Sequence, residues 1–367
     1  MFDTTDTQMM QNALALAWQG RFSTSPNPRV GCVIARGNQI VGQGFHIQAG
    51  GPHAEVHALR QAGELARGAT AYVTLEPCSH YGRTPPCAEG LIEAGVSRVV
   101  AAMRDPNPLV AGKGLAMLEA AGIEVACGLL EEEARALNRG FLSRIERGRP
   151  FVRLKCAASL DGKTALSDGR SQWITGAEAR ADVQTLRAES CAVITGIGTV
   201  LADDPQLNVR TFPTLRQPAR IILDSALQTP LDSKLVQDSG APTLIVTLEQ
   251  DEGRLNTYRR FPHIQIISPS ETQGRIDLHE VLQILAKAGY GEVMVEAGAT
   301  LAGAFLRADL VDEIVLYQAP KILGNPGRNL FDLTENPLSL DRPPDWKTIS
   351  FTALDNDIKW VLQPSSL

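Results

Sequence analysis

The sequence predicts two α/β domains, and three observations support this prediction. The chain has 367 residues, enough for about two domains of roughly 100–200 residues each. Stretches with strand character alternate with stretches of helix character in both halves, which is typical of layered α/β folds. The stretch RGRP at residues 147–150 has the character of a linker. We therefore expect domains at residues 1–147 and 148–367.

In the first half, each element follows from its local pattern. Residues 6–20 form an amphipathic helix that ends at Gly20. RVGCVIA and IVGQGFH are strands joined by a turn at Gly37-Asn38, which is a hairpin signal. Beyond them we expect helices at 53–66, 85–95, 111–122 and 131–146, with strands at 70–76, 97–103 and 123–128.

The second half has the same alternation. A strand begins at Phe151 and runs into a polar loop, and another begins at Cys191, meets a glycine turn and leads to a short helix before Pro205. The other expected strands are 219–225, 241–247, 263–268, 292–298, 312–320 and a C-terminal pair near 345–363, and the expected helices are 177–190, 278–289 and 299–308.

Composition excludes several classes of protein. The net charge is −6 and neither half is basic, which argues against a nucleic-acid surface. The N-terminus MFDTTDTQMM lacks the basic start and apolar run of a signal peptide. The sequence contains no uninterrupted apolar run of about 18 residues, so we do not expect a membrane span. Six scattered cysteines do not suggest a disulfide scaffold. We therefore expect a cytoplasmic protein whose thiols are reduced.

A zinc site is the strongest functional signal. His53, Cys78 and Cys87 supply the three nitrogen and sulfur ligands of a catalytic zinc, which leaves a fourth position for water. Glu55 lies two residues after the histidine, where its carboxylate can move a proton from that water to a leaving amine. The order H-A-E followed by E-P-C matches the signature of zinc deaminases that act on nucleobases.

The second cysteine departs from that signature. Eight residues separate Cys78 from Cys87, whereas the usual spacing is two. Cys78 can bind from a loop and Cys87 from the first turn of a helix that Pro85 and Pro86 would start. The inserted loop carries His80 and Arg83, and we expect these groups near a phosphorylated substrate.

A structural zinc site is an alternative interpretation of these residues, whereas a metalloprotease is rejected. A structural zinc site would need a fourth ligand, which His57 or His80 could supply. A metalloprotease needs H-E-x-x-H, and this chain has H-x-E-x-H instead. We expect His57 to pack beside the site rather than to bind metal. The remaining cysteines lie in apolar, strand-like runs and are expected in the core: Cys32, Cys127, Cys156 and Cys191.

Glycines in the second half suggest a nucleotide site more weakly. VITGIGTV and EVMVEAGATLAG each place glycine between a strand and a helix, where phosphate can approach backbone N–H groups. Neither is a full G-x-G-x-x-G, since Leu201 stands where the third glycine would be.

Longer motifs resemble one known family. NPRVGCVI, GGPHAEVHAL, AYVTLEPCSHYGRTPPC and DPNPLVAGKG in the first half, with KCAASLDGKTA, SQWIT, TVLADDPQLNVR and VEAGATLAGAFL in the second, resemble the bifunctional deaminase–reductase of bacterial riboflavin biosynthesis. The resemblance covers essentially the whole chain, and the C-x8-C spacing is that family's own variant. It implies a three-layer, cytidine-deaminase-like N-terminal domain and a C-terminal domain that resembles dihydrofolate reductase.

The resemblance also implies two reactions. Zinc-dependent hydrolysis would remove the 2-amino group of 2,5-diamino-6-ribosylamino-4(3H)-pyrimidinone 5′-phosphate. NADPH would then reduce the ribosyl group and give 5-amino-6-(5-phosphoribitylamino)uracil. The expected partners are therefore small molecules, with no nucleic acid or membrane, and the chain is expected to form a homo-oligomer, a dimer by preference.

Site residues carry over by position. The resemblance implies zinc ligands at His53, Cys78 and Cys87, with Glu55 as the proton shuttle. It implies deaminase substrate contacts at Asn27, His46, His80 and Arg83, although part of the family has lysine at the last position. NADPH contacts are expected at Ala157, Trp173, Thr199, Asp203, Ser225, Gly298, Ala299, Thr300, Leu301, Ala302, Gly303 and Ala304. Reductase substrate contacts are expected at Ser171, Arg187, Leu207, Arg210 and Glu296.

Three points of chemistry qualify these expectations. Arg187 and Arg210 can clamp a phosphate, and Trp173 offers a flat face to a ring. Trp173 could instead be ordinary packing. The proton donor of the reductase is expected to be Lys155 or Asp203, although Asp203 and Asp204 could equally cap a helix or turn before Pro205.

Two other functions compete with the bifunctional enzyme. One is a zinc deaminase of another nucleobase, such as a base in tRNA, joined to an unrelated second domain. The C-x8-C loop, the acidic balance and the second-half motifs argue against it. The other is a non-catalytic zinc module that binds a partner, against which Glu55 argues, since a structural site needs no carboxylate beside an open coordination position.

Overall fold

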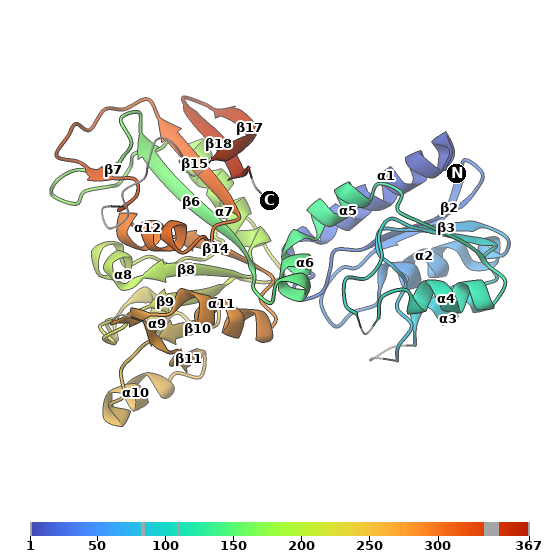
Figure 1. Cartoon of the computed structure of the whole chain (residues 1–367), viewed down its shortest axis with the longest axis horizontal. Helices are drawn as coiled ribbons and strands as arrows, with labels where there is room; N and C mark the ends of the chain where they lie inside the picture. The colour runs from blue at the N-terminus through green and yellow to red at the C-terminus, as the bar shows by residue number, and fades with distance from the viewer. Residues whose placement is uncertain (1, 82–84, 109, 273, 334–344, 366–367) are drawn as a thin grey trace. The chain divides into compact units, whose positions relative to one another are not determined.

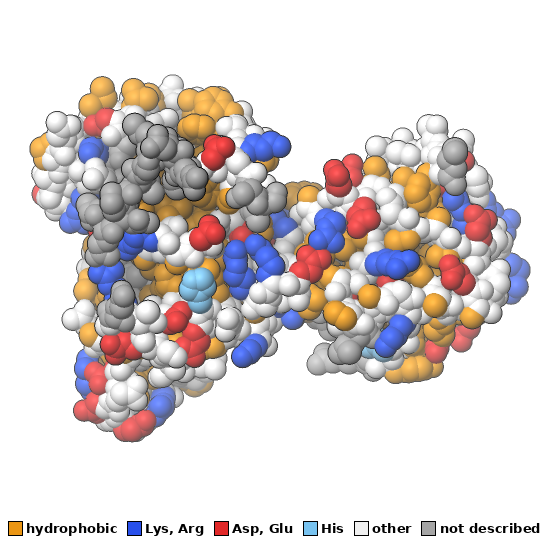
Figure 2. All heavy atoms as spheres, in the orientation of Figure 1, with side chains coloured by type: hydrophobic (Ala, Val, Ile, Leu, Met, Phe, Trp, Pro, Cys, Tyr) orange, Lys and Arg blue, Asp and Glu red, His pale blue; other side chains and the backbone are white. Residues whose placement is uncertain are grey.

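The chain folds into two compact units, 1–148 and 149–367, in the computed structural model. The division falls one residue after the predicted domain boundary. The structure describes residues 2–81, 85–108, 110–272, 274–333 and 345–365. None of the described helices is both long and apolar enough to cross a membrane. Acidic and basic side chains are interspersed on the displayed face of each unit (Figure 2).

The first unit is built on a five-stranded sheet with strand order β2-β1-β3-β4-β5. Strand β1 pairs antiparallel with β2 and β3, while β3, β4 and β5 run parallel. The elements in chain order are α1 (Thr4–Gln19), η1 (Gly20–Phe22), β1 (Gly31–Arg36), β2 (Gln39–Phe45), α2 (Ala54–Ala62), η2 (Gly63–Ala66), β3 (Thr70–Val73), α3 (Cys87–Glu93), β4 (Arg98–Ala101), α4 (Lys113–Ala120), β5 (Glu124–Cys127), α5 (Glu131–Leu137) and α6 (Arg139–Glu146).

Helices cover both faces of this sheet, so the predicted three layers are confirmed (Figure 1). Side chains of α2, α3 and α4 form one buried cluster with the strands, and side chains of α1, α5 and α6 form the other. Close approach of α1 explains Gly31 in β1, because a Cβ there would lie 2.0 Å from the Ala13 carbonyl oxygen.

Two predicted helices of the first unit are interrupted. The helix expected at 53–66 ends at Ala62, because Gly63 adopts a φ of +52° and a 3₁₀ turn follows. The helix expected at 131–146 divides at Asn138. The Asn138 amide accepts from the Arg29 N–H at 2.8 Å and donates to the Arg29 carbonyl at 3.0 Å. This tertiary contact holds Asn138 out of helical geometry, which helical periodicity does not reveal.

The second unit contains a nine-stranded sheet with strand order β11-β10-β9-β8-β14-β6-β15-β18-β17. Its strands are parallel as far as β15, and β18 and β17 complete it antiparallel. The elements are β6 (Phe151–Ser159), β7 (Lys163–Ala165), α7 (Ala177–Glu189), β8 (Ala192–Gly196), α8 (Ile197–Asp203), β9 (Ala219–Leu223), α9 (Lys234–Gln237), β10 (Thr243–Val246), α10 (Glu252–Arg259), β11 (Ile264–Ile267), β12 (Glu271–Thr272), β13 (Arg275–Ile276), α11 (Leu278–Lys287), β14 (Glu292–Glu296), α12 (Ala299–Arg307), β15 (Glu313–Ala319), β16 (Arg328–Asn329), β17 (Trp346–Leu354) and β18 (Asp357–Pro364).

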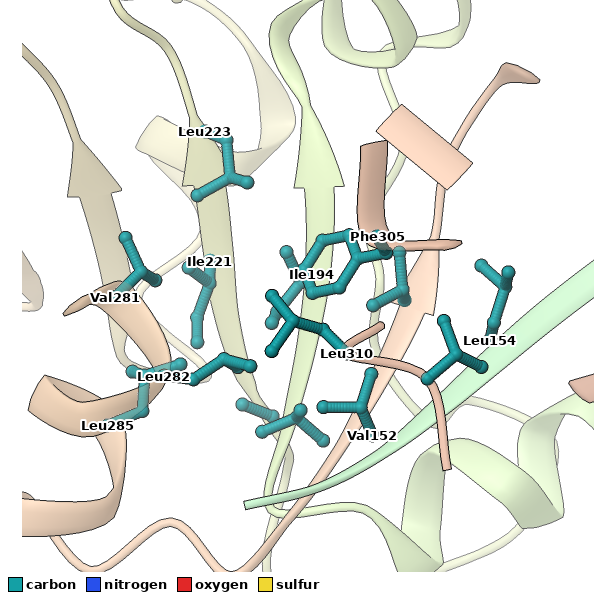
Figure 3. Close-up of a cluster of buried hydrophobic side chains, with 14 of the residues drawn as sticks. Val152, Leu154, Ile194, Ile221, Leu223, Val281, Leu282, Leu285, Phe305 and Leu310 are labelled. Atoms are coloured by element: carbon teal, nitrogen blue, oxygen red, sulfur yellow. The ribbon is translucent and has the colours of Figure 1, made fainter. Parts of the chain in front are cut away.

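This sheet is also covered on both faces. Helices α11 and α12 pack on one face through Leu282, Leu285 and Phe305, which meet Ile194 and Ile221 of the strands (Figure 3). Helices α7, α8, α9 and α10 pack on the other face. The layered α/β architecture predicted from alternating elements is therefore confirmed.

Some elements of the second unit were not expected from the sequence. Helix α10 is polar and buries only Leu255 and Tyr258, so it lacks a continuous apolar stripe. Strands β7 and β16 are three and two residues long and pair with each other in a separate two-stranded sheet. Elements this short or this polar give little periodic signal.

Candidate functional site

The structure gathers the three predicted zinc ligands. His53 is the residue immediately before α2, Cys78 follows β3 in a loop, and Cys87 is the first residue of α3. Their ligand atoms all lie within 4.8 Å of one another. His53 Nδ1 lies 3.2 Å from Cys87 Sγ and 3.7 Å from Cys78 Sγ, so Nδ1 is the nitrogen that faces the thiols.

Local hydrogen bonds hold Cys78 and Cys87 together although eight residues separate them in the sequence. The Cys87 N–H donates to Cys78 Sγ at 3.3 Å, and the Ala88 N–H donates to the Cys78 carbonyl at 3.2 Å. The start of α3 therefore holds the Cys78 loop, and Cys87 lies in the first turn of this helix, as the two prolines before it predicted. Hydrogen bonds from Cys87 and His53 lower the pKa of the Cys78 thiol. This shift favours the thiolate, which is the form that binds a metal.

Glu55 is placed for proton transfer. It lies in the first turn of α2, is buried, and has one carboxyl oxygen, Oε2, with no hydrogen-bond partner in the described structure. Burial raises the pKa of Glu55, and the nearby positive charge of His53 partly offsets this. A carboxyl with a raised pKa can both accept and return a proton near neutral pH.

Asn27 and His46 lie beside the zinc ligands. The ring of His46 is 5.6 Å from the ring of His53, edge to face. His46 Nδ1 lies 3.0 Å from the Pro52 carbonyl, which can only accept, so His46 Nε2 accepts from the Asn27 amide at 3.0 Å. Burial lowers the pKa of His46 and keeps its ring neutral.

The other residues considered for the deaminase site have less support from the structure. His80 is exposed in the loop after Cys78, and Arg83 lies outside the described residues. His57 is not among the ligand atoms, and its buried Nε2 has no hydrogen-bond partner among the described residues. Cys32, Cys156 and Cys191 are buried as expected, whereas Cys127 is only half-buried.

One group beside this site was not predicted. Glu76, two residues before Cys78, is buried, and its carboxylate accepts four backbone hydrogen bonds from residues 105–115. Asp105 in that stretch is half-buried. Burial raises the pKa of Asp105, the hydrogen bond from the Asn107 N–H lowers it, and the charges of Glu76, His80 and Cys78 contribute less. The sequence signal was the acidic residue in E-P-C, which the metal motif did not require.

The second unit has a cleft of about 1290 Å³ at the carboxyl ends of its parallel strands. Strands β8 and β14 each run through a glycine into a helix there, and the first residues of α8 and α12 line the cleft. Open parallel sheets bind ligands at this edge. The predicted residues that line it are Lys155, Ala157, Ser171, Trp173, Arg187, Thr199, Asp203, Leu207, Arg210, Ser225, Glu296, Gly298, Ala299, Thr300, Leu301 and Ala304.

Two predicted residues point elsewhere. Ala302 is 1% exposed and belongs to the core beneath α12. Gly303 faces the Asp332 backbone, where a Cβ would lie 2.1 Å from the carbonyl oxygen. Helix α12 does not contact the cleft through every residue of the predicted run, because only part of the helix surface faces the cleft.

Arg187 is already paired within the cleft. Its Nε donates to Glu296 Oε1 at 2.6 Å, its Nη2 to Oε2 at 2.9 Å, and its Nη1 to the Asn208 carbonyl at 3.1 Å. Burial raises the pKa of Glu296, but Arg187 and nearby cations outweigh it, so the net pKa is lowered. Arg210 is exposed, and its guanidinium has no hydrogen-bond partner among the described residues. Of the two arginines, Arg210 is therefore the one available to a phosphate.

Trp173 is exposed at the cleft and held by its neighbours. The Arg180 guanidinium lies 4.7 Å from its ring centroid, and Lys321 Nζ donates to its carbonyl at 2.8 Å. Its side chain is 61% exposed, so the alternative of ordinary core packing is not what the structure shows. An exposed ring at this position can stack on a flat ligand.

Comparison with known families matches both units. Residues 3–103 match the cytidine and deoxycytidylate deaminase zinc-binding region, and residues 150–360 match the RibD C-terminal domain. The second match contradicts the alternative in which the second domain is unrelated to the riboflavin enzyme.

Individual relatives align along nearly the whole chain. The riboflavin biosynthesis protein RibD of Escherichia coli (strain K12) is 51% identical over 341 residues, which cover 89% of this chain and 91% of that protein. The solved structure of Acinetobacter baumannii RibD, form 1, has a TM-score of 0.90 at 47% identity and covers 98% of this chain and 99% of its own. A Thermotoga maritima structure, described as a diaminohydroxyphosphoribosylaminopyrimidine deaminase/5-amino-6-(5-phosphoribosylamino)uracil reductase, has a TM-score of 0.87 at 34% identity, with the same coverage.

Proposed function

The chain belongs to the RibD family of bifunctional riboflavin biosynthesis deaminase–reductases, and on this premise we propose a substrate, a cofactor and site residues for each activity. The first unit is a zinc-dependent deaminase of the cytidine deaminase type, and the second is a pyrimidine reductase. The proposed substrate is 2,5-diamino-6-ribosylamino-4(3H)-pyrimidinone 5′-phosphate, which loses its 2-amino group as ammonia. The proposed final product is 5-amino-6-(5-phosphoribitylamino)uracil.

The cluster of His53, Cys78, Cys87 and Glu55 carries the deaminase proposal. One imidazole and two thiols within 4.8 Å fit a zinc ion in both ligand number and chemistry. Zinc held by these three residues would supply an activated water molecule at neutral pH. The buried Glu55 carboxylate is placed to accept a proton and to return it to the departing amino group.

Asn27 and His46 support a role in orienting the pyrimidine. The Asn27 amide N–H₂ is committed to His46 Nε2, so the Asn27 carbonyl oxygen is directed to accept from an N–H of the substrate. His80 and Arg83 are proposed to contact the phosphorylated side chain, since both lie in the inserted loop after Cys78. A neutral His46 suits this site, because a second cation would repel the metal.

In the cleft of the second unit, NADPH is the proposed cofactor. It supplies a hydride to the sugar carbon, and the protein orients the two reactants. The glycines that precede α8 and α12 allow close approach of a dinucleotide to backbone N–H groups, and Trp173 offers an exposed ring.

Opening the ribosyl ring to ribityl also needs a proton for the released oxygen. Lys155 and Asp203 both line the cleft. Lys155 lies opposite Glu296 in the pairing of β6 and β14, beside the Arg187 pair, and is the better supported donor. Arg210 is proposed to bind the substrate phosphate, while Arg187 holds Glu296 in place. Ser171 and Leu207 complete the proposed substrate contacts.

One reaction mixture tests both activities. Purified protein with bound zinc, the proposed substrate and NADPH should release ammonia first and oxidise NADPH afterwards. Ammonia without NADPH oxidation would contradict the reductase proposal, and no ammonia from zinc-loaded protein would contradict the substrate. A homo-oligomer and a cytoplasmic location remain predictions, which size-exclusion chromatography with light scattering and cell fractionation would check.

A further inference from the structure

The carboxylate of Glu76 joins two segments of the deaminase unit. Its Oε2 accepts from the Asp105 N–H at 3.1 Å and the Gly112 N–H at 2.9 Å. Its Oε1 accepts from the Gly114 N–H at 2.9 Å and the Leu115 N–H at 3.4 Å. We call residues 105–108 and 110–115 the anchored segment. A single buried side chain, 4% exposed, thus satisfies four backbone donors of the anchored segment.

Glu76 acts as the N-terminal cap of α4 from outside the helix. Gly112, the residue before α4, supplies no side-chain cap of its own. The first N–H groups of a helix need acceptors, and a carboxylate there also interacts favourably with the helix dipole. The orientation of α4 is therefore tied to the residue two positions before the zinc ligand Cys78.

Close backbone contact reinforces this tie. A Cβ at Gly114 would lie 1.9 Å from the Pro77 carbonyl oxygen, so only glycine lets the anchored segment lie against the ligand loop. Gly112 has a φ of +79°, which also favours glycine. Both glycines of the AGKG motif are accounted for by this junction, which the metal chemistry does not explain.

The anchored segment begins at Asp105. The Asp105 N–H donates to Glu76, and Asp105 Oδ1 accepts from the Asn107 N–H at 2.8 Å. Glu76 therefore fixes the backbone of a half-buried acidic residue and ties it to the stretch that leads into Cys78. A carboxylate such as that of Asp105 can accept from the N–H groups of the amino-rich substrate proposed above.

We propose that Glu76 is a positioning residue for deamination, which holds the anchored segment and its Asp105 carboxylate beside the metal site as part of the substrate-binding wall. The inference rests on the proposed deaminase function. Glu76 touches neither the metal ligands' donor atoms nor the reacting group, so its effect should appear in substrate binding more than in turnover.

The test compares Glu76→Gln with the unaltered full-length protein. An amide replaces one acceptor oxygen by an N–H₂ group that faces backbone donors, while size is kept. We expect zinc content per chain to be unchanged, and KM for ammonia release to rise by about 10- to 100-fold, the range for groups that support a metal site from outside it. The kcat value should fall much less, and reduction of the deaminated intermediate should be unchanged.

Gly114→Ala tests the same junction without altering charge. The added Cβ must push the anchored segment from Pro77, so KM should rise as in Glu76→Gln. Asp6→Asn is the matched control. Asp6 is an equally buried carboxylate that accepts hydrogen bonds from Arg98 at the amino end of β4. The predicted zinc ligand Cys78 follows the carboxyl end of β3, which is parallel to β4, so Asp6 lies at the opposite edge of the sheet. Asp6→Asn should lower thermal stability and leave KM unchanged.

The outcomes separate this inference from the proposed function. An unchanged KM in Glu76→Gln, or a KM that rises equally in Asp6→Asn, would overturn the positioning role while ammonia release by the unaltered protein still supports the deaminase. Loss of zinc from Glu76→Gln would also overturn it, because Glu76 would then act through Cys78. No ammonia release by the zinc-loaded, unaltered protein would refute the proposed function itself.

Discussion

Replacing Arg187 by alanine tests whether the buried pair in the reductase cleft is structural. In the native protein Arg187 is 8% exposed and gives two hydrogen bonds to Glu296 and one to the Asn208 carbonyl. Alanine removes all three and leaves the Glu296 carboxylate buried without its principal cation. A phosphate-binding arginine would be expected to keep its guanidinium accessible, so the two roles predict different effects on stability.

The expected loss follows from the burial of the pair. Removing one partner of a buried ion pair destabilises a protein by about 3–5 kcal/mol, because the other charge is left uncompensated. For a domain of about 200 residues, 1 kcal/mol corresponds to roughly 2–4 °C in Tm, so we expect a fall of about 6–20 °C. Arg210→Ala is the control, since Arg210 is exposed and an exposed substitution changes stability by about 0.5 kcal/mol or less.

Differential scanning calorimetry of the full chain measures this effect. Added zinc should raise only the transition of the deaminase unit, which identifies the other transition as that of the reductase unit. Arg187→Ala should lower that transition, and Arg210→Ala should leave it in place while raising KM for the phosphorylated intermediate. Equal Tm values for Arg187→Ala and the native protein would refute the structural role of the pair.

The pH dependence of the Tm difference between the native protein and Arg187→Ala shows whether the Arg187–Glu296 ion pair stabilises the fold. The pKa of Glu296 is lowered in the folded protein, so the ionised carboxylate contributes stability above its unfolded pKa. That contribution should disappear as the pH falls below about 4.5 toward the lowered value. The Tm difference between the native protein and Arg187→Ala should therefore shrink on acidification, and a constant difference would argue that lost packing dominates.

Three further outcomes are expected. Glu55→Gln should keep its zinc and reduce ammonia release by about 10²- to 10⁴-fold, with reduction of the deaminated intermediate intact, because only the proton carrier is removed; loss of both activities would contradict independent sites. Treatment with a strong chelator should abolish ammonia release and leave NADPH oxidation of that intermediate unchanged, and readded zinc should restore the first activity. Phe305→Ala should destabilise the reductase unit by about 3–5 kcal/mol in denaturant unfolding, because Phe305 is fully buried in the core beneath α12; a loss below about 1 kcal/mol would contradict that packing.

Much of the fold follows from local patterns in the chain. Apolar runs predict most of the longer strands, and glycine or proline marks where Cys87 begins α3 and where α12 begins after Gly298. These signals are local because propensity and periodicity are set by residues close in sequence. Polar α10 and the shortest strands escaped prediction, since their formation depends on what they pack against.

The metal site was predicted more completely than the cleft. Its residue types are chemically specific, so the sequence suffices to predict His53, Glu55, Cys78 and Cys87, and the fold brings the three predicted metal ligands together. Cleft residues are less specific. The direction of each α12 side chain and the pairing of Arg187 with Glu296 depend on contacts between residues far apart in the chain, 109 positions for that pair, which no local pattern encodes.

The sequence alone determined the class of chemistry, because a histidine, two cysteines and a glutamate in that order suit few reactions. It also determined the α/β layering, through the spacing of apolar residues. The tertiary structure decided which charged groups face the cleft and which are paired. Arg210 lines the cleft, whereas Arg187 is paired with Glu296. The Glu76 carboxylate accepts hydrogen bonds from the backbone at the start of α4. That distinction belongs to the folded state, because burial makes an unpaired charge costly and so selects partners across the chain rather than along it.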